Sequence, residues 1–334
     1  MTDGFDNLVP ETLVLAAEAA LGRRLEPVAV PFASYINRVY ELRGVDGEHV
    51  VAKFYRPGRW SRAALLEEHA FMCACVEDDI PIAAPLELTT GGTLGEVDNI
   101  MFALFPKRAG RRFEPLEDED WIRLGMLTAR VHNAGDRVSA AHRPKLTPQD
   151  STAHALNRLL AADFIAAAEK SALAEVVSEL MAAITPEFEG EELITVHGDL
   201  HGGNILIRPP DGLTMIDFDD MACAPAAQDI WVLLPDYAQN ATRELELLLE
   251  GYRDFRYLPT PSWRLLEGLR AMHMVYYLDW CARQSGDFMF RRNFPEWGTP
   301  GFWRAELAAL NTQLDMLLER QSQKEDDGFD AWDY

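Results

Sequence analysis

Residues 193–220 read LITVHGDLHGGNILIRPPDGLTMIDFDD, and this stretch decides the fold. Two short apolar runs, at 205–207 and 213–216, flank the sequence Pro-Pro-Asp-Gly at 209–212. Proline, aspartate and glycine together favour a turn, so the sequence predicts a β-hairpin here. The first strand begins where the second ends, because the strands of a hairpin are antiparallel.

Three polar side chains are therefore expected at one end of this hairpin. Asn204 precedes the first strand, Asp217 follows the second, and Asp199 stands in the short glycine-rich loop just before Asn204. Magnesium prefers oxygen ligands, and it is usually held by one or two carboxylates while substrate phosphates complete its shell. The stretch predicts a site for Mg²⁺ and for proton transfer.

The spacing of these residues matches the protein-kinase template H-R-D-L-x-x-x-N followed by D-F-G. The segment HGDLHGGN at 197–204 agrees at every fixed position except one, where Gly198 replaces the arginine. In the second triplet, Asp219 stands where the template has glycine. The chain reaches Pro225 soon afterwards without A-P-E, so we expect no regulatory phosphorylation of an activation loop.

The kinase template gives each polar residue a role as a hypothesis. Asp199 and Asp217 are the candidate catalytic residues, with Asp199 accepting or orienting the proton of the attacking hydroxyl. Asn204 and Asp217 are the candidate ligands of Mg²⁺, which would lie against the phosphates of the co-substrate ATP.

A lysine on a strand of the first lobe should meet the α- and β-phosphates of ATP. Lys53 in HVVAKFY fits, because a lone cation in an apolar strand is costly without a partner. Alone, it could also be an edge lysine that reaches solvent. Its partner should be a glutamate on the next helix, where Glu67 and Glu68 are both candidates and Glu68 is our choice.

The glycine-rich loop G-x-G-x-x-G is missing. Residues 33–39, Ala-Ser-Tyr-Ile-Asn-Arg-Val, stand in its place, so Ser34 with backbone amides and Asn37 is expected to cover the phosphates. The apolar run NIMFALFP at 99–106 leads to the next lobe. We expect the backbone around Phe102–Leu104 to hydrogen-bond adenine, a role compatible with an ordinary core strand.

The pattern along the chain predicts an α+β, bilobal, protein-kinase-like fold. Residues 1–106 are rich in short β-type runs and form the expected nucleotide-binding lobe, which is followed by a linker at 107–117. Residues 118–320 show helical periodicity and form the larger, mainly helical catalytic lobe. Residues 321–334 are acidic and lack periodicity, which is typical of a frayed tail.

Composition excludes several classes of partner. The 334 residues carry 31 Lys and Arg against 54 Asp and Glu, a formal net charge of −23 that disfavours nucleic acid and anionic membranes. Hydrophobic residues make up 48% and charged residues 25%, as in globular proteins. The acidic N-terminus resembles no signal peptide, and four cysteines are too few for a disulfide scaffold. We therefore expect a cytoplasmic monomer with free thiols.

HGDLHGGN and IDFDD together resemble the aminoglycoside/choline phosphotransferase-like kinase superfamily. The segments SYINRVY, VAKFYRPGRW, FPKRAGRRFE and LRAMHMVYYLDW are similar to its bacterial stress-response Ser/Thr protein kinases. The resemblance implies ATP and Mg²⁺, autophosphorylation, phosphorylation of protein Ser/Thr and a role in stress survival. It implies that Ser34 is the ATP-site serine and that Asp229 supports the catalytic loop. Asp229 could also cap the following helix.

Two other functions remain open. The first is a small-molecule kinase acting on a hydroxyl of an amino sugar, choline or homoserine. The negative field would steer a cationic substrate, and Asp219, Asp220, Asp236 and the run 117–120 could line its cleft or be solvated surface. The second is a nucleotide-binding scaffold without activity, which the presence of Lys53 and the polar triad disfavours.

Overall fold

The computed structural model describes residues 4–5, 8–34, 36–115, 117–208 and 212–327. Its contacts divide the chain into two compact units. Unit 1 comprises Met1–Pro144, Ile194–Cys223 and Leu247–Tyr257, and unit 2 comprises Lys145–Leu193, Ala224–Glu246 and Leu258–Tyr334. This division differs from the expected lobes, because the catalytic hairpin and the first helix beyond the linker belong to unit 1. The mixed α/β architecture, with an antiparallel sheet and a mainly helical remainder, confirms the predicted fold class.

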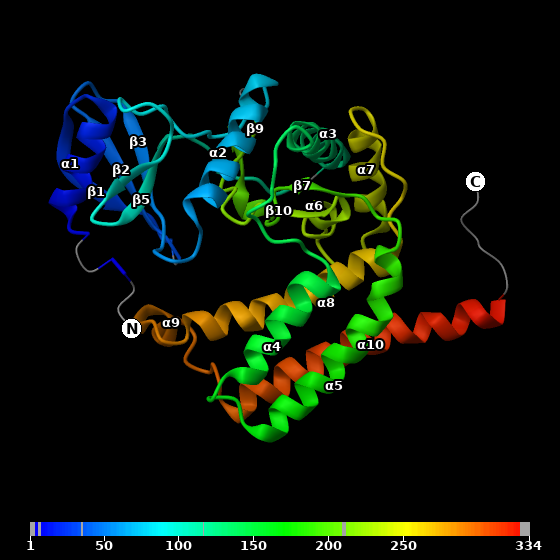
Figure 1. The fold of residues 1–334 in the computed structure, drawn as a ribbon. Helices are drawn as coiled ribbons and strands as arrows, with labels where there is room; N and C mark the ends of the chain where they lie inside the picture. Colours follow the sequence, from blue (N-terminus) through cyan, green and yellow to red (C-terminus); the bar gives the residue numbers. More distant parts are fainter. Residues whose placement is uncertain (1–3, 6–7, 35, 116, 209–211, 328–334) are drawn as a thin grey trace. The chain divides into compact units, whose positions relative to one another are not determined.

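Unit 1 contains an antiparallel five-stranded sheet with the order β1-β2-β3-β5-β4. The strands are β1 (Leu25–Pro31), β2 (Arg38–Gly44), β3 (His49–Phe54), β4 (Gly95–Val97) and β5 (Ile100–Pro106). Helix α1 (Pro10–Leu21) lies beside the sheet (Figure 1), and its apolar side chains share a core with β2, β3 and β5. It ends at Gly22, whose φ of 65° is the left-handed cap that glycine favours.

The segment around the Gly91–Gly92 turn departs from expectation. Two strand-like pieces are predicted there, but Leu86 and Leu88 lie in irregular chain, and β4 is the one strand found nearby among the described residues. The expected linker in turn contains a two-residue strand, β6 (Arg111–Arg112). Strand β6 pairs with β8 of the catalytic hairpin. Its extended conformation therefore depends on a partner far away in the sequence and not on a pattern in its own two residues.

Helix α2 (Arg62–Glu77) follows β3, and the hydroxyl of Ser61 caps it by accepting a hydrogen bond from the main-chain N of Ala64 at 3.1 Å. Helix α3 (Asp118–Gly135) begins at residue 118, where the helical periodicity of the sequence begins. Helix α7 comprises Thr242–Arg253, and its residues 247–253, which belong to unit 1, pack closely on α3. There a Cβ on Gly251 would lie 1.9 Å from the main-chain oxygen of Ile122.

The predicted hairpin is formed by β8 (Ile205–Arg208) and β9 (Gly212–Met215), with Ile205 opposite Met215. The expected turn residues 209–211 lie outside the described residues. The main-chain N of Met215 donates to Pro81 at 3.0 Å, so the hairpin is attached to the chain that follows α2. Two short strands flank the hairpin in the sequence, β7 (Leu193–Val196) before it and β10 (Ala222–Pro225) after it. These two strands pair with each other.

Unit 2 is a helical assembly around an apolar core. Its longer helices are α4 (Ala153–Ala161), α5 (Ala167–Ile184), α8 (Trp263–Gln284) and α10 (Pro300–Asp327), with α6 (Ala227–Trp231) and α9 (Phe288–Asn293) between them in sequence. The four longer helices lie close to one another (Figure 1), and their leucine, valine and alanine side chains form one buried cluster. Within the described ranges, no helix is long and apolar enough to cross a membrane. All four cysteines are free, as predicted.

Candidate active site

The loop between β7 and β8 brings Asp199 and Asn204 together. The side-chain amide of Asn204 donates to the main-chain oxygen of Asp199 at 2.9 Å and lies 3.4 Å from its carboxylate. The imidazole of His201 caps the short turn by accepting from the main-chain N of Gly203 at 2.9 Å. These bonds fix the loop, while the Asp199 side chain is 36% exposed and open to a substrate.

The glycine in place of the template arginine has a steric cause. Gly198 has a φ of 86°, and a Cβ there would lie 2.1 Å from the main-chain oxygen of Asp220. No side chain fits at this distance, so the backbones of the loop and of the Asp217–Asp220 segment approach each other as only glycine permits. The preceding His197 holds the same segment, donating from Nε2 to the main-chain oxygen of Ile216 at 3.0 Å.

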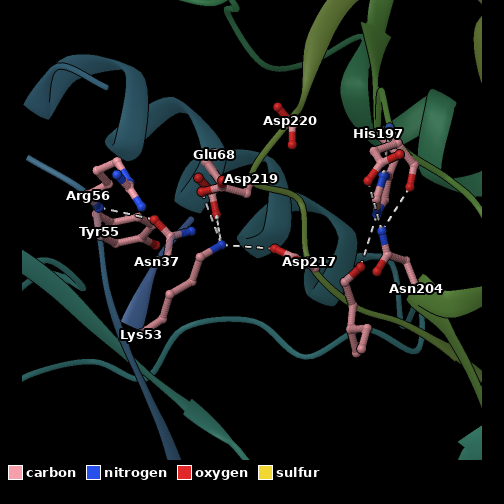
Figure 2. Close-up of polar contacts among 12 residues, drawn as sticks. Asn37, Lys53, Tyr55, Arg56, Glu68, His197, Asn204, Asp217, Asp219 and Asp220 are labelled. Carbon is pink, nitrogen blue, oxygen red and sulfur yellow. Dashed lines mark hydrogen bonds and ion pairs between the residues drawn. The ribbon is translucent and has the colours of Figure 1, made fainter. Parts of the chain in front are cut away.

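Asp217 follows β9, as the hairpin predicts. The main-chain N of Ile216 donates to the oxygen of Asn204 at 2.9 Å, which keeps the two ends of the hairpin together. Asp217 has a φ of 62°, a left-handed conformation that is uncommon outside glycine. Its side chain is 54% exposed and points toward Lys53 rather than toward Asn204 (Figure 2).

Lys53 lies among three carboxylates in unit 1. Its Nζ is 2.9 Å from Asp217, 3.1 Å from Asp219 and 3.7 Å from Glu68, while its side chain is only 9% exposed. Figure 2 shows Asp217 to the right of the amine and the carboxylates of Glu68 and Asp219 above it. Burial alone would lower the pKa of Lys53, but the surrounding negative charges raise it well above its usual value. The lysine is a buried cation.

Of the two glutamates considered for Lys53, Glu68 is the one in contact with it. Glu67 instead accepts bonds from the main-chain N and the imidazole of His142, at 2.9 and 2.8 Å. The buried guanidinium of Arg143 donates to Glu68 at 2.7 Å and to the main-chain oxygen of Asp219 at 2.8 Å. Arg143 therefore joins α2 to the segment that carries Asp219.

Asp219 is shared by two cations. Its Oδ1 faces Lys53, and its Oδ2 lies 2.8 Å from Arg59, which also binds Asp220 at 2.6 Å. Burial would raise the pKa of Asp219, but the positive charges of Lys53 and Arg59 outweigh it and lower this pKa to about 2. For Glu68, burial prevails over Lys53 and raises the pKa to about 7.

A second buried network lies beside this cluster. The imidazole of His69, on α2, is hydrogen-bonded to the hydroxyl of Tyr55 at 2.9 Å and to that of Thr93 at 2.7 Å. Burial, with the nearby positive charges of Lys53 and Arg143, lowers the pKa of His69 to about 3. The histidine stays neutral and packs α2 against the end of β3.

Ser34 and Asn37, the two residues expected to cover the phosphates, differ in how deeply they are buried. Ser34 is half-buried in the turn between β1 and β2, where its main-chain N donates to Phe32 at 2.8 Å. Asn37 is buried, and its side-chain oxygen accepts the main-chain N of Arg56 at 3.1 Å (Figure 2). The side-chain oxygen of Asn37 thus joins the start of β2 to the chain after β3, and the expectation that Asn37 covers phosphates stays a prediction.

The adenine contact expected at Phe102–Leu104 stays a prediction. Phe102 pairs with Phe54 in β3 on one side and with Gly95 in β4 on the other. The main-chain oxygen of Leu104 accepts the N of Leu86 at 2.7 Å, so this one acceptor is already used.

The donor set fits the expected Mg²⁺. The nitrogen of the Asn204 amide is used by Asp199, so its oxygen is the atom available to a cation, and Asp217 offers an exposed carboxylate. Within the described part of the chain, no group of three or more His, Cys, Asp or Glu is arranged to hold a metal ion. One amide and one carboxylate suit a magnesium ion whose remaining ligands are phosphates and water.

Sequence reasoning found Glu68 but missed Asp219 as a partner of Lys53, and it missed Arg59, which binds Asp219. Arg59 belongs to the quoted segment VAKFYRPGRW, and Asp219 occupies the glycine position of the D-F-G template. An aspartate at that template position was the available signal, because a second buried carboxylate requires a cation nearby. Asp229 lies inside α6, whose N-cap is Ala226, so the expectation that it caps a helix is wrong.

Residues 28–269 match the model of the phosphotransferase enzyme family, APH. The chain therefore belongs to this family and is a kinase-type phosphotransferase. It is similar to stress response kinase A of Escherichia coli strain K12, with 35% identity over 316 residues, 94% of this chain and 95% of that protein. A Salmonella typhimurium protein named serine/threonine protein kinase RdoA is 34% identical over the same shares of both chains.

Solved structures share the fold at lower identity. The amicoumacin kinase hAmiN, solved with AMP-PNP, Ca²⁺ and Ami, aligns over 95% of this chain and 97% of its own, with a TM-score of 0.74 and 17% identity. A microcompartment-associated aminopropanol kinase aligns over 90% and 95%, with a TM-score of 0.65 and 17% identity. Both are small-molecule kinases by name, so the fold alone does not select the acceptor.

Proposed function

We propose that this protein is an ATP- and Mg²⁺-dependent Ser/Thr protein kinase that also phosphorylates itself and acts in the bacterial cytoplasm in the response to stress. The observation that carries phosphoryl transfer is the presence of Lys53, Asp199, Asn204 and Asp217 in one compact unit. The relatives at 34–35% identity, which are named as stress-response and Ser/Thr protein kinases, support a protein acceptor.

In the proposed reaction, Asp199 accepts the proton of the acceptor hydroxyl as its oxygen attacks the γ-phosphorus of ATP. The bond from that phosphorus to the β–γ bridging oxygen breaks, and ADP leaves. Asn204 and Asp217 hold Mg²⁺, which neutralises charge on the transferring phosphates when bound. Lys53 pairs with the α- and β-phosphates, so its contact with Asp217 is replaced when the nucleotide enters.

The remaining contacts to ATP follow from which groups the sheet leaves available. Ser34 and its neighbouring amides cover the phosphates from the turn between β1 and β2. Adenine binds the backbone around Phe102–Leu104 and the chain that follows β5, where the main-chain oxygen of Leu104 already accepts from Leu86. Glu68 keeps Lys53 in place from α2.

A small-molecule kinase is the alternative, and the two named small-molecule kinases of the same fold favour it. The discriminating experiment supplies γ-labelled ATP to a cell lysate with wild type or Asp217→Ala. Label in protein bands with the wild type alone supports a protein kinase. Label found only in small molecules would contradict the proposal and establish the alternative.

Asp199→Asn tests the proton acceptor. Loss of a general base costs about 10²–10⁴-fold in rate, so we expect kcat to fall by that factor while ATP still binds. Asp46→Asn, in the exposed turn after β2, is the matched control. Unchanged turnover in Asp199→Asn would remove Asp199 from the mechanism.

A further inference from the structure

The short strand β6 places two arginines beside the catalytic loop. Arg111 lies opposite Ile207 and Arg112 opposite Leu206, and the main-chain N of Phe113 donates to Ile205 at 2.9 Å. Strand β8 starts directly after Asn204. The backbone of β6 is thus fixed against the strand that leaves the catalytic loop, and both segments belong to unit 1.

The side chain of Arg112 reaches the loop itself. Its guanidinium nitrogens lie 3.9 and 4.0 Å from the position that a Cβ on Gly202 would take. The neighbouring His201 is 3.6 Å from the Asp199 carboxylate. Its pKa is lowered first by burial and then by the neighbouring His197 and Arg112. By its distance to Gly202, the guanidinium of Arg112 lies beside the loop that carries Asp199.

The side chains of Arg111 and Arg112 have no partner within the described residues. Both are exposed, and neither guanidinium has a hydrogen bond or ion pair there, although their backbones pair with β8. With 54 acidic residues against 31 basic ones, a carboxylate partner would be easy to supply. Nearby Lys107, by contrast, is bound to Glu41 at 2.6 Å. The chain leaves Arg111 and Arg112 available to an anion from outside.

We propose that Arg111 and Arg112 select a Ser/Thr acceptor segment that carries aspartate or glutamate close to the acceptor residue. Guanidinium groups bind carboxylates through paired, charge-assisted hydrogen bonds. The ATP phosphates already have Lys53 and Mg²⁺ in the proposed function, on which this inference rests. The preference is local and opposes the bulk charge of −23, which alone would favour a cationic substrate.

The test compares two Ser-containing peptides of equal length, one flanked by acidic and one by basic residues. The enzymes are wild type, R111E/R112E and the control R24E/R43E, which makes the same change of charge at exposed Arg24, just before β1, and exposed Arg43 on β2. We expect the wild type to prefer the acidic peptide. In R111E/R112E, kcat/KM for that peptide should fall at least tenfold and should rise for the basic one.

The outcomes separate this inference from the proposed function. Autophosphorylation by the wild type with equal use of both peptides, unchanged in R111E/R112E, would overturn the inference and leave the kinase proposal intact. A rise confined to the KM for ATP would assign the arginines to the nucleotide and also overturn it. If the wild type labels no protein at all, both proposals fall. Preference for a phosphoserine-flanked peptide over the acidic one would replace carboxylate by phosphate as the selected group. If the charge reversal in R111E/R112E impairs folding, R111Q/R112Q replaces it in the same peptide assays.

Discussion

The two compact units bury carboxylates in opposite ways. In unit 2, Asp279 on α8 is fully buried, and Arg158 binds both of its oxygens at 2.8 Å while Arg283 adds a contact at 3.1 Å. In unit 1, Lys53 is shared by three carboxylates, and within the described residues one oxygen of Glu68 has no hydrogen bond at all. Two arginines thus contact one carboxylate at Asp279, whereas one lysine contacts three carboxylates at Lys53.

This difference separates structural from functional ion pairs. A buried carboxylate whose oxygens are satisfied needs nothing further. A lysine held among three carboxylates, one of them 54% exposed, is ready to exchange a partner for a phosphate. Each carboxylate near Lys53 other than Asp217 also has an arginine, since Arg59 binds Asp219 and Arg143 binds Glu68. Lys53 can therefore change partners without leaving a buried carboxylate unpaired.

The largest expected effect on stability concerns unit 2. The double substitution R158M/R283M leaves Asp279 buried without a cation, which costs about 3–5 kcal/mol of unfolding free energy. Denaturant unfolding measures this loss. Arg304→Met, at an exposed position of α10, is the control and should change stability by less than about 0.5 kcal/mol. A loss below about 1 kcal/mol in the double variant would show that Asp279 needs no partner.

A smaller effect is expected from Arg59→Met in unit 1. Without Arg59, Asp219 keeps only Lys53 as a side-chain cation and holds it more tightly against ATP. We expect the KM for ATP to rise about tenfold, equal to about 1.4 kcal/mol, with a smaller change in kcat. Adding Asp219→Asn should restore most of the KM.

Arg62→Met is the matched control for Arg59→Met, because Arg62 is 57% exposed and its contact with Glu96 is 3.8 Å long. Its KM for ATP should equal that of the wild type. The expectation for Arg59→Met assumes that Arg59 and Lys53 compete for Asp219. A KM for ATP that rises further when Asp219→Asn is added to Arg59→Met would contradict this assumption.

Much of the fold follows from local patterns in the sequence, and the parts that do not are instructive. The hairpin at 205–216 and the bounds of α3 follow from turn residues and helical periodicity. Strand β6 does not, because two residues cannot show an alternation. The apolar run at 99–106 leaves the adenine contact a prediction, because such a run is equally consistent with a central strand and with a strand that ends at a hinge.

The candidate site shows the same limit. Asp199, Asn204 and Asp217 follow from spacing, since a hairpin brings its two ends together. Arg59 and Arg143 do not, because their contacts with Asp219 and Glu68 join residues far apart in the sequence. Such pairs depend on tertiary packing, which a single sequence does not reveal.

A further expected effect is a pH dependence of stability due to His69. Its pKa is about 3 in the folded protein against an ordinary value near 6.5, so between these values the unfolded chain binds a proton that the folded protein does not. Stability is therefore lost as the pH falls, by at most about 1.4 kcal/mol per pH unit from this group. Glu68, whose pKa is raised to about 7, contributes the opposite slope above its ordinary pKa.

Denaturant unfolding of wild type and His69→Gln between pH 6 and pH 4 isolates the histidine, because Glu68 is present in both proteins. The wild type should lose more stability than His69→Gln over this interval. His154→Gln, at an exposed position of α4, should behave as the wild type. Equal slopes in wild type and His69→Gln would mean that His69 is protonated in the folded protein.

The most direct measurement concerns Lys53. It gives, for the same variant, the free energy of unfolding without ligand and the stabilisation by nucleotide. Unfolding of wild type and Lys53→Met is followed without ligand and with increasing Mg²⁺ and ATP, because a ligand that binds only the folded protein stabilises it in proportion to its affinity. We predict that Lys53→Met unfolds within about 1 kcal/mol of the wild type without ligand, since Glu68 and Asp219 keep their arginines. It should lose the stabilisation by Mg²⁺ and ATP. A variant that loses several kcal/mol without ligand but is still stabilised by ATP would contradict this and make Lys53 a structural residue.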